Sequence, residues 1–566
     1  MIEQNGEDMK KIPIGIDDYK KIIEENCAYV DKTLFIQEII ERGNELALIP
    51  RPRRFGKTVN MSMLKYFFEK TKEDNSHLFS PYKIWQTDCR GEQGTYPVVF
   101  FTLKGIKQET WELAYEKLKA LIAKEFERHR YLLDSPSKLS PDEEKIFHAI
   151  LRQEANQANT EMSLNYLTTW LDRHHDKKVI VLIDEYDAPI HMAYFHGFYP
   201  RIINFMRNWL GDGLKGNVSL ERGVITGILR IAKENIFSDL NHASNFTMFS
   251  EDFDDKFGLL EEEVLPLLKE YGMGDNLEEV RKWYNGYHIG AHALYNPWSI
   301  LNYIQQKALK PYWVNTSGNE LIKEQLIQKG VFFKEDFETL VLGGTIIKLV
   351  DEGLVFASLK NSKEAIWGLL LFSGYLTMAA PPVLDGILYS SELKIPNQEV
   401  LMLFQGMLRE YFTETFSTSW TGLLEHLVAG NIEAFSEEFQ ELIMDIFSVH
   451  DIHKNAPERV YHAFVLGLVA SLKGAYEIKS NKESGLGRYD VCLIPKNKEK
   501  LGLILEFKKA KKEESLEELA EVALKQIQNL QYTHDLKSRG IKKVLALGMA
   551  FQGKVVCIKD QSLTFL

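Results

Sequence analysis

The chain has 566 residues, which is more than one hydrophobic core can organise, so about two to four domains are expected. A hydrophobic fraction of 45% and a charged fraction of 26% are typical of a soluble globular protein. The net charge of −12 excludes a general attraction to nucleic acid, so any such binding has to be local. Four widely separated cysteines exclude a C-x-x-C metal pair and a disulfide framework. Together with a polar N-terminus that has no apolar signal region, they indicate a reducing cytoplasm.

The first predicted elements are a lead-in helix that starts near Ile12 and a second helix that begins at Lys32. Asp31 is expected to be the N-cap of the second helix, because its carboxylate can accept the first free backbone N–H groups. An apolar, strand-like run, Leu46–Pro50, follows and enters a tight loop.

The loop ends in Gly-Lys-Thr at the start of a helix-like stretch, which is the pattern of a loop that holds the phosphates of a nucleoside triphosphate. Lys57 is expected to neutralise the β/γ oxygens, and the Thr58 hydroxyl is expected to bind Mg²⁺. Arg51 stands where the standard pattern has its first glycine, so the interpretation depends on partners downstream. The residues predicted to line the nucleotide are Arg53, Arg54, Phe55, Gly56, Lys57 and Thr58.

A strand is predicted at Tyr96–Leu103, and a helical insertion is predicted over residues 135–160. The apolar run Val179–Ile183 then ends in Asp184 and Glu185, which is typical of a buried parallel strand with acids at its carboxyl end. Asp184 is expected to hold Mg²⁺ through water, and Glu185 to orient or deprotonate the attacking water. The alternative is a core strand that ends in a solvated turn. The Gly-Lys-Thr loop favours the catalytic interpretation.

A further strand, Arg222–Leu229, carries Thr226 near its end. In ATPases with a glutamate after the Walker B aspartate, a strand between the Walker A and Walker B strands carries a polar residue that senses the γ-phosphate. Thr226 fits that role. Arg230 and Lys233 follow closely and are candidates for phosphate contacts, although a basic residue after a strand is more often solvated. The alternation of strands and helices from residue 46 to 230 predicts an α/β fold with a parallel sheet covered on both faces. The candidates for an arginine finger are Arg53, Arg54, Arg222 and Arg230.

The middle of the chain offers less chemistry. Aromatic motifs at 283–287 and 295–298 are expected to pack a domain against its neighbour, with a stacking role as the alternative. Residues 320–455 are expected to be mainly helical. The uncharged run Ala365–Leu384 has the length of a membrane span, but it contains prolines and lacks flanking basic residues, which favours a buried helix followed by a turn. The predicted domains are residues 1–320, 321–455 and 456–566.

The last hundred residues carry a second chemical pattern. A helix-like run, Tyr461–Leu472, precedes strands at Tyr476–Lys479, Tyr489–Ile494 and Leu501–Lys508, with a hairpin turn at residues 484–487. Because side chains alternate along a strand, Glu506 and Lys508 share one face and Phe507 turns into the core. With Asp490 on a neighbouring strand, this arrangement suits metal-dependent phosphodiester hydrolysis.

In that interpretation Asp490 and Glu506 bind Mg²⁺, with Mn²⁺ as an alternative, and Lys508 positions the attacking water. Gln526, on the helix that starts at Leu516, can face the metal. Residues 471–512 hold 11 Lys and Arg against 5 Asp and Glu, which suits a phosphate backbone. The alternative is a surface hairpin with a Glu–Lys pair.

With both patterns in view, the chain resembles bacterial AAA-ATPase-like proteins with a C-terminal PD-(D/E)XK nuclease-like domain. The matching segments include RPRRFGKT at Arg51, LIDEYDAPI at Leu182, TGILRIAKENIFSDLN at Thr226, SNKESGLGRYDV at Ser480 and LEFKKA at Leu505. The family pattern itself has arginine at the position of Arg51. The resemblance implies Thr226 as the sensor, and it implies Asp490, Glu506, Lys508 and Gln526 as the nuclease core. Superfamily members often add an acid from the first helix. Residues 461–472 lack one, and His462 and Glu483 are the candidates to replace it.

The sequence therefore predicts a cytoplasmic, ATP-dependent enzyme that uses Mg²⁺ and acts on nucleic acid, with DNA favoured, through its basic C-terminal domain. No membrane association is expected, and homo-oligomerisation is left open. One alternative is a nucleotide-dependent switch whose C-terminal domain binds nucleic acid or a partner without cutting. Another is a plain ATPase whose tail serves assembly.

Overall fold

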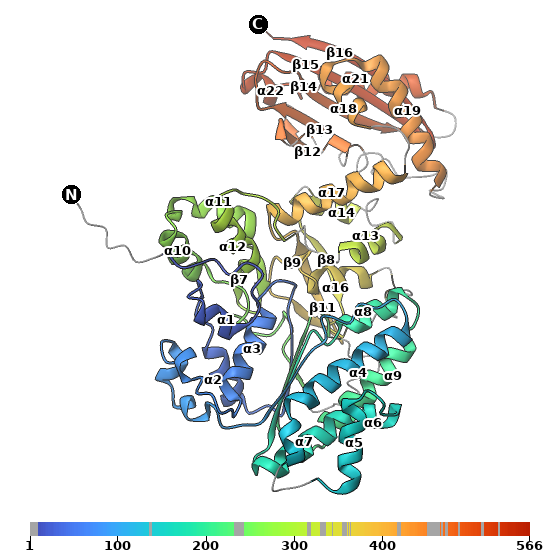
Figure 1. The fold of residues 1–566 in the computed structure, drawn as a ribbon. Helices are drawn as coiled ribbons and strands as arrows, with labels where there is room; N and C mark the ends of the chain where they lie inside the picture. Colours follow the sequence, from blue (N-terminus) through green and yellow to red (C-terminus); the bar gives the residue numbers. More distant parts are fainter. Residues whose placement is uncertain are drawn as a thin grey trace, which may run out of the picture. The chain divides into compact units, whose positions relative to one another are not determined.

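The computed structural model folds into two compact units (Figure 1). Unit 1 consists of Met1–Thr316 and Ile347–Glu399, and unit 2 of Ser317–Ile346 and Val400–Leu566. The structure describes residues 9–565 apart from these segments: 135–138, 231–242, 314–318, 329–334, 342, 354–358, 360–361, 363, 416–419, 450–464, 466–467, 470–471, 473, 485–486, 511–513 and 530–531.

The central sheet of unit 1 has five parallel strands in the order β2-β3-β4-β1-β5. Their bounds are β1 (Leu46–Pro50), β2 (Val98–Thr102), β3 (Val179–Asp184), β4 (Leu220–Gly227) and β5 (Ala243–Asn245). The predicted parallel sheet is confirmed, and the predicted position of the Thr226 strand is also confirmed, because β4 lies between β1 and β3. The carboxyl ends of β1, β3 and β4 therefore meet at one edge, where such sheets bind ligands.

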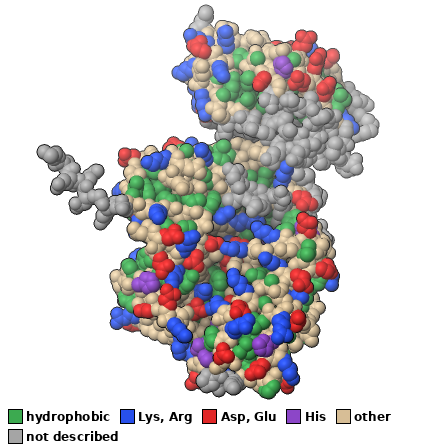
Figure 2. All heavy atoms as spheres, in the orientation of Figure 1, with side chains coloured by type: hydrophobic (Ala, Val, Ile, Leu, Met, Phe, Trp, Pro, Cys, Tyr) green, Lys and Arg blue, Asp and Glu red, His purple; other side chains and the backbone are tan. Residues whose placement is uncertain are grey.

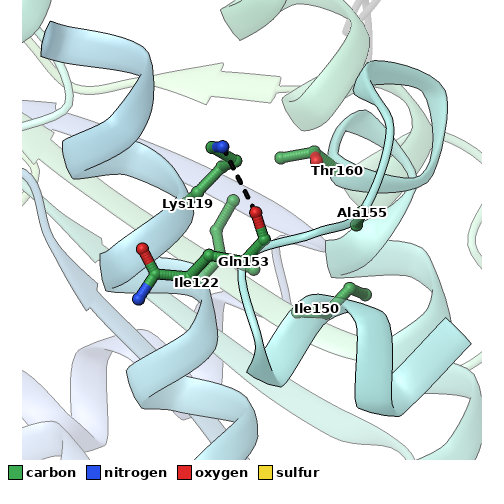
Figure 3. Close-up of a pocket in the computed structure, with 6 residues that line it drawn as sticks. All are labelled: Lys119, Ile122, Ile150, Gln153, Ala155 and Thr160. Atoms are coloured by element: carbon green, nitrogen blue, oxygen red, sulfur yellow. Dashed lines mark hydrogen bonds between the residues drawn. The ribbon is translucent and has the colours of Figure 1, made fainter.

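Helices connect and cover these strands. They include α3 (Lys57–Phe68), α4 (Trp111–Arg128), α7 (Ser163–His175), α8 (Ala188–Phe195) and α9 (Tyr199–Leu214). In the predicted insertion, α5 (Pro141–Leu151) and α6 (Gln157–Glu161) are helical as expected. Together with α4 they enclose a small cavity of about 10 Å³, across which Lys119 Nζ donates to the Gln153 carbonyl at 3.2 Å (Figure 3). Its lining contains none of the predicted site residues.

The N-terminal helices are α1 (Tyr19–Glu24) and α2 (Leu34–Arg42). The prediction for α2 is wrong by two residues, since the helix begins at Leu34 with Thr33 as its N-cap. The reason lies in the side chains before it. Asp31 accepts the backbone N–H and the hydroxyl of Thr33 at 2.9 and 2.6 Å, while Lys32 is buried and pairs with Glu263.

The rest of unit 1 packs around tyrosines. This part contains α10 (Glu261–Glu270), α11 (Leu277–Tyr284), α12 (Pro297–Gln306) and a hairpin of β6 (Tyr287–Ile289) and β7 (His292–Leu294). Tyr284 and Tyr295, from the two aromatic motifs, share a buried core with Tyr303 and Tyr312. These tyrosines of the two motifs therefore pack within unit 1, and the packing of one domain against its neighbour stays a prediction.

The uncharged run at 365–384 forms the buried helix α16 (Ala365–Phe372), which turns into β9 (Thr377–Met378). Within the described residues, no helix combines the length and the apolar character that crossing a membrane requires. β10 (Val383–Asp385), β11 (Leu388–Lys394) and β8 (Ile346–Val350) form a small sheet with β9. The region expected to be mainly helical thus contains a sheet, and the three domain boundaries stay a prediction.

Unit 2 contains a five-stranded sheet in the order β12-β13-β14-β15-β16, in which only β14 and β15 are parallel. The strands are β12 (Tyr476–Ser484), β13 (Gly487–Pro495), β14 (Gly502–Lys509), β15 (Lys543–Gln552) and β16 (Val555–Thr564). α21 (Leu516–Asn529) connects β14 to the parallel β15, as a crossover requires. The three predicted strands are confirmed, whereas residues 485–486 of the predicted turn and most of the predicted helix 461–472 lie outside the described residues.

In the described part of unit 2 the helices, in addition to α21, are α13 (Asn319–Gln328), α14 (Glu335–Val341), most of α17 (Gln398–Thr415), α18 (Trp420–Ala429), α19 (Ile432–Val449) and α22 (His534–Ser538). On the face shown in Figure 2, acidic and basic side chains are interspersed over unit 1. Over unit 2, the visible acidic side chains gather near α19 and α21, whose sequences are rich in glutamate.

Candidate active sites

The predicted phosphate-binding loop runs from β1 to α3. It turns through two residues with left-handed backbone conformations, Arg54 at φ 65° and Gly56 at φ 82°. Gly56 adopts this conformation without cost and is the N-cap of α3, so the N-terminus of the helix opens onto the loop. Phe55 is buried and packs edge-on against Tyr287 with ring centroids 5.1 Å apart, which fixes the loop to the core of unit 1.

Arg51 is fully buried and shapes the loop from inside. Its guanidinium donates to the carbonyl oxygens of Pro50, Phe246 and Phe253 at 2.9, 2.6 and 3.1 Å, and more weakly to those of Thr247 and Asp252. Burial lowers the pKa of Arg51 to about 9. The residue that replaces the first glycine of the standard loop therefore braces the backbone and does not face a ligand.

Lys57 folds back onto the loop that it belongs to. Its ammonium donates to the carbonyl oxygens of Arg51 and Pro52 at 3.0 and 2.9 Å. Burial lowers the pKa of Lys57, and the nearby carboxylates of Glu185 and Asp184 oppose that shift. An ammonium held by backbone carbonyls inside this loop is placed to exchange them for phosphate oxygens.

Asp184 brings three elements together. Its buried carboxylate accepts hydroxyl hydrogen bonds from Thr58 on α3 and Thr226 on β4, each at 2.8 Å. Thr102 at the end of β2 adds a third, weaker contact at 3.3 Å, and sequence reasoning missed this residue because nothing in its own segment marks it. A hydroxyl that donates its proton to Asp184 keeps its lone pairs for a cation, so the donor set suits Mg²⁺.

Glu185 follows Asp184 in a left-handed backbone conformation at φ 50°. Burial raises the pKa of Glu185, and the Lys57 ammonium lowers it in part. A carboxyl group with a raised pKa beside a phosphate-binding loop has the properties of a group that exchanges a proton with water.

The arginines occupy different places. Arg54 is exposed, and its guanidinium lies 4.3 Å from the ring centroid of Trp298. The Arg53 carbonyl accepts from Asn296 Nδ2 and Trp313 Nε1 at 3.4 and 3.2 Å. Arg230 pairs with Glu352 at 3.0 Å, and Arg222 donates to the Ile39 carbonyl. Lys233 lies outside the described residues. Phosphate contacts by Arg53, Arg54 and Arg230 stay predictions.

The second site lies in unit 2, where β13 and β14 bring the predicted residues together. Asp490 accepts the backbone N–H of Phe507 at 2.7 Å, and the Asp490 N–H reaches Glu506 at 3.4 Å. Lys508 Nζ lies 3.3 Å from Glu506 Oε1, and Gln526 on α21 donates to the same oxygen. Phe507 is buried, so the predicted alternation of side chains is confirmed.

Glu506 is almost fully buried beside a second carboxylate, and both conditions disfavour its charge. Burial, and then the proximity of Asp490, raise the pKa of Glu506 to about 7, against the opposing effect of Lys508. A divalent cation between the two carboxylates would relieve this repulsion, so the pair fits Mg²⁺ or Mn²⁺. The bound ion would polarise a phosphodiester and lower the pKa of its water.

The donor set at this site has two carboxylates. Among the side chains that the structure describes, no group of three or more His, Cys, Asp and Glu lies close enough to hold a metal. The two groups considered as a further ligand, His462 and the side chain of Glu483, both lie outside the described part of the chain. Tyr532, which sequence reasoning did not place here, accepts from Gln526 Nε2 at 3.2 Å.

The fold and these two sites define a class of protein, in which a P-loop nucleotide-binding domain precedes a nuclease-like domain. Comparison with known families agrees. Residues 13–237 match the AAA-ATPase-like family model, described as Predicted AAA-ATPase, and residues 456–561 match the PD-(D/E)XK nuclease superfamily. The chain therefore carries an AAA-ATPase-like domain and a C-terminal domain of the PD-(D/E)XK nuclease superfamily.

A relative that aligns with most of this chain comes from Azotobacter chroococcum mcd 1. It bears the name "Uncharacterized protein in vnfD 5'region" and is 26% identical over 503 residues, which span 86% of this chain and 87% of that protein. No solved structure matches the chain.

Proposed function

We propose that this protein binds and hydrolyses ATP with Mg²⁺ in unit 1 and that its C-terminal domain is a metal-dependent nuclease acting on nucleic acid, with DNA favoured. In this proposal Lys57 and Thr58 bind the phosphates and the ion, Asp184 holds the ion through water, and Glu185 orients the attacking water. The free thiols Cys27, Cys89, Cys492 and Cys557 support a cytoplasmic location.

The observation that carries the ATPase proposal is the hydrogen-bonded set around Asp184. The Asp184 carboxylate accepts hydrogen bonds from two hydroxyls. One belongs to Thr58, directly after Lys57, and the other to Thr226 on β4. Such a set from three separate elements is not expected of residues without a shared function. ATP hydrolysis needs one, because the ion, the γ-phosphate and the attacking water have to be aligned.

The nuclease proposal is supported by the contacts among Asp490, Glu506, Lys508 and Gln526. Two carboxylates for a cation and an ammonium beside them are the groups that phosphodiester hydrolysis uses. The presence of only two acids in the described part of the site favours a second candidate, in which the same domain binds nucleic acid or a partner under the control of nucleotide and does not cut.

The test is cleavage of single- and double-stranded DNA and RNA by the purified full-length protein, with Mg²⁺ or Mn²⁺ and with or without ATP. ATP hydrolysis is measured in parallel. Lys57→Ala and Glu506→Ala are the informative variants. Lys70→Ala, an exposed lysine just after α3, and Glu518→Ala, an exposed glutamate on α21, are the matched controls.

Cleavage that Glu506→Ala abolishes and Lys57→Ala alters would support a coupled ATPase and nuclease. Intact ATP hydrolysis without cleavage of any substrate would favour the switch. ATP hydrolysis that nucleic acid does not stimulate, together with no binding of nucleic acid, would instead point to a plain ATPase with an assembly domain.

A further inference from the structure

Two residues directly after Asp184 and Glu185 hold the chain that follows the Thr226 strand. Tyr186 and Asp187 are both buried, with 0% and 1% of their surface exposed. The Asp187 Oδ2 atom accepts the consecutive backbone N–H groups of Ile228 and Leu229 at 2.8 and 3.0 Å. The Tyr186 hydroxyl donates to the Leu229 carbonyl at 2.7 Å.

Gly227 shows how closely these groups approach the end of β4. A Cβ atom on Gly227 would lie 2.6 Å from Asp187 Oδ1 and 2.8 Å from the Tyr186 ring, so no larger residue fits. On its other side, the Gly227 carbonyl accepts the backbone N–H of Arg51 at 3.0 Å. The end of β4 is therefore fixed both by Asp187 and by the phosphate-binding loop.

A buried carboxylate is costly unless hydrogen bonds compensate its lost hydration. Here two backbone N–H groups do so, and the ring of His191 lies 3.5 Å away. Burial lowers the pKa of His191 to about 4, so this ring is neutral at physiological pH and adds no charge. Asp187 faces backbone groups, which indicates a geometric role for its carboxylate.

The same turn connects Asp187 to the groups proposed for hydrolysis. The Tyr186 backbone N–H donates to the Thr226 carbonyl at 3.1 Å. The side-chain hydroxyl of the same threonine contacts Asp184. Glu185 lies between these anchors in a left-handed conformation, which is unfavourable for a residue with a side chain and persists only where its surroundings enforce it.

We propose that Asp187 is a positioning residue for hydrolysis, which holds Glu185 and the Thr226 end of β4 in one fixed geometry. Asp187 itself touches neither the phosphates nor the ion in this assignment. The inference rests on the proposed ATPase function and concerns the chemical step, since the two N–H groups that Asp187 accepts belong to Ile228 and Leu229 and not to the phosphate-binding loop.

The experiment measures kcat for ATP hydrolysis and the Kd values for ATP and ADP in full-length Asp187→Ala and Asp187→Asn. We expect Asp187→Ala to lower kcat on the order of 100-fold, since a small displacement of catalytic groups has effects of that size. Both Kd values should stay within about threefold, because Lys57 and the loop amides are unchanged. Asp187→Asn should recover most of the activity, because its amide oxygen can accept the same two N–H groups.

Several outcomes would overturn the inference. If the wild type hydrolyses ATP and Asp187→Ala is equally active, the inference is wrong and the proposed function is unaffected. A parallel loss of kcat and of affinity for both nucleotides would indicate general damage instead. If Asp187→Ala does not fold, Tyr186→Phe, which removes the hydroxyl that contacts the Leu229 carbonyl, must slow kcat without changing Kd. A wild-type protein that neither binds nor hydrolyses ATP would overturn the proposed function itself.

Discussion

Arg51 occupies the position of the first glycine of the standard phosphate-binding loop, and its side chain braces this loop. Its guanidinium contacts five carbonyl oxygens, most of them in residues 246–253, and it lies 5.3 Å from the ring centroid of Phe257. The planar fork of arginine suits several acceptors at once, whereas a lysine ammonium is a single point. The loop is thus anchored to a segment almost 200 positions away in the chain.

We predict that Arg51→Gly, which restores the standard motif, destabilises the protein. The substitution removes the guanidinium donors from several buried carbonyl oxygens, which should lower the free energy of unfolding by about 3 kcal/mol or more. Thermal or urea denaturation with and without ATP would measure the change, and Arg51→Lys should recover only part of the loss. A variant with glycine that is as stable as the wild type would show that the bracing contacts contribute little.

Glu399 is a buried carboxyl group that the sequence did not single out. Its carboxylate oxygens accept hydrogen bonds from the backbone N–H of Trp313 at 2.5 Å and from the Ser299 hydroxyl at 2.8 Å. Burial raises the pKa of Glu399 to about 7, against the effect of these hydrogen bonds. The folded protein therefore holds the proton more tightly than the unfolded chain, in which the pKa is near 4.5.

This shift predicts a pH dependence of stability. The contribution of Glu399 is fully present below about pH 4.5 and is lost as the pH rises through about 7, and it corresponds to roughly 3 kcal/mol. Glu399→Gln resembles the protonated form, because its amide can donate to Ser299 and accept from Trp313. We expect the stability advantage of Glu399→Gln over the wild type to grow between pH 5 and pH 8 in thermal denaturation. A constant difference across that range would contradict the assignment.

At the scale of elements, the second site depends on how closely α21 approaches the sheet of unit 2. A Cβ atom on Gly548 in β15 would lie 2.2 Å from the Ala520 carbonyl oxygen and 2.6 Å from the Leu524 backbone nitrogen. Because both are backbone atoms of α21, no side-chain rotation relieves the contact. This close approach lets Gln526, half a turn after Leu524, reach Glu506.

We therefore predict that Gly548→Ala displaces α21. Overpacking of this kind costs about 1–3 kcal/mol, which denaturation of the full-length protein would detect. It should also weaken the binding of Mn²⁺ to the Asp490–Glu506 pair. Gly406→Ala in α17 is the matched control, because a Cβ atom there meets nothing within 4 Å and alanine favours helix. Equal stability of the two variants would show that α21 has room to move.

Much of both sites could be predicted because their residues lie on regular elements. Strand alternation placed Glu506 and Lys508 on one face, and the apolar run before Asp184 placed that carboxylate at the edge of the sheet. The contacts of Arg51 and Thr102 could not be predicted, since their partners are distant in sequence and carry no local signal. The start of α2 was predicted at Lys32 instead of Leu34 for a related reason, because the contact of Lys32 with Glu263 has no local signal in the sequence.

At the scale of the whole molecule, the two units are interleaved in sequence. Residues 317–346 belong to unit 2, although unit 1 continues from residue 347 to 399. The described part of this segment is packed within unit 2, since Ile322, Leu326, Phe337 and Leu340 are buried and the Phe337 ring lies 5.7 Å from that of Phe404. Simple truncation therefore cannot separate the units.

We predict that a fragment of residues 1–399 aggregates or is cleaved by protease within residues 317–346, because their apolar side chains lose their partners. Replacing residues 317–346 by a flexible linker in the same fragment should give a soluble protein that binds ATP. Limited proteolysis and size-exclusion chromatography would compare the two. A stable, monodisperse 1–399 fragment would show that residues 317–346 do not need unit 2.

The surroundings of the phosphate-binding loop have a practical consequence. Two tryptophans contact the loop directly, since the Trp313 indole N–H donates to the Arg53 carbonyl and Trp298 lies beneath the Arg54 guanidinium. Indole emission responds to nearby charge and to hydrogen bonding, so these two side chains should report the occupancy of the proposed nucleotide site. If the proposed ATPase function holds, their emission would follow the order of nucleotide arrival, hydrolysis and release in real time without an attached dye.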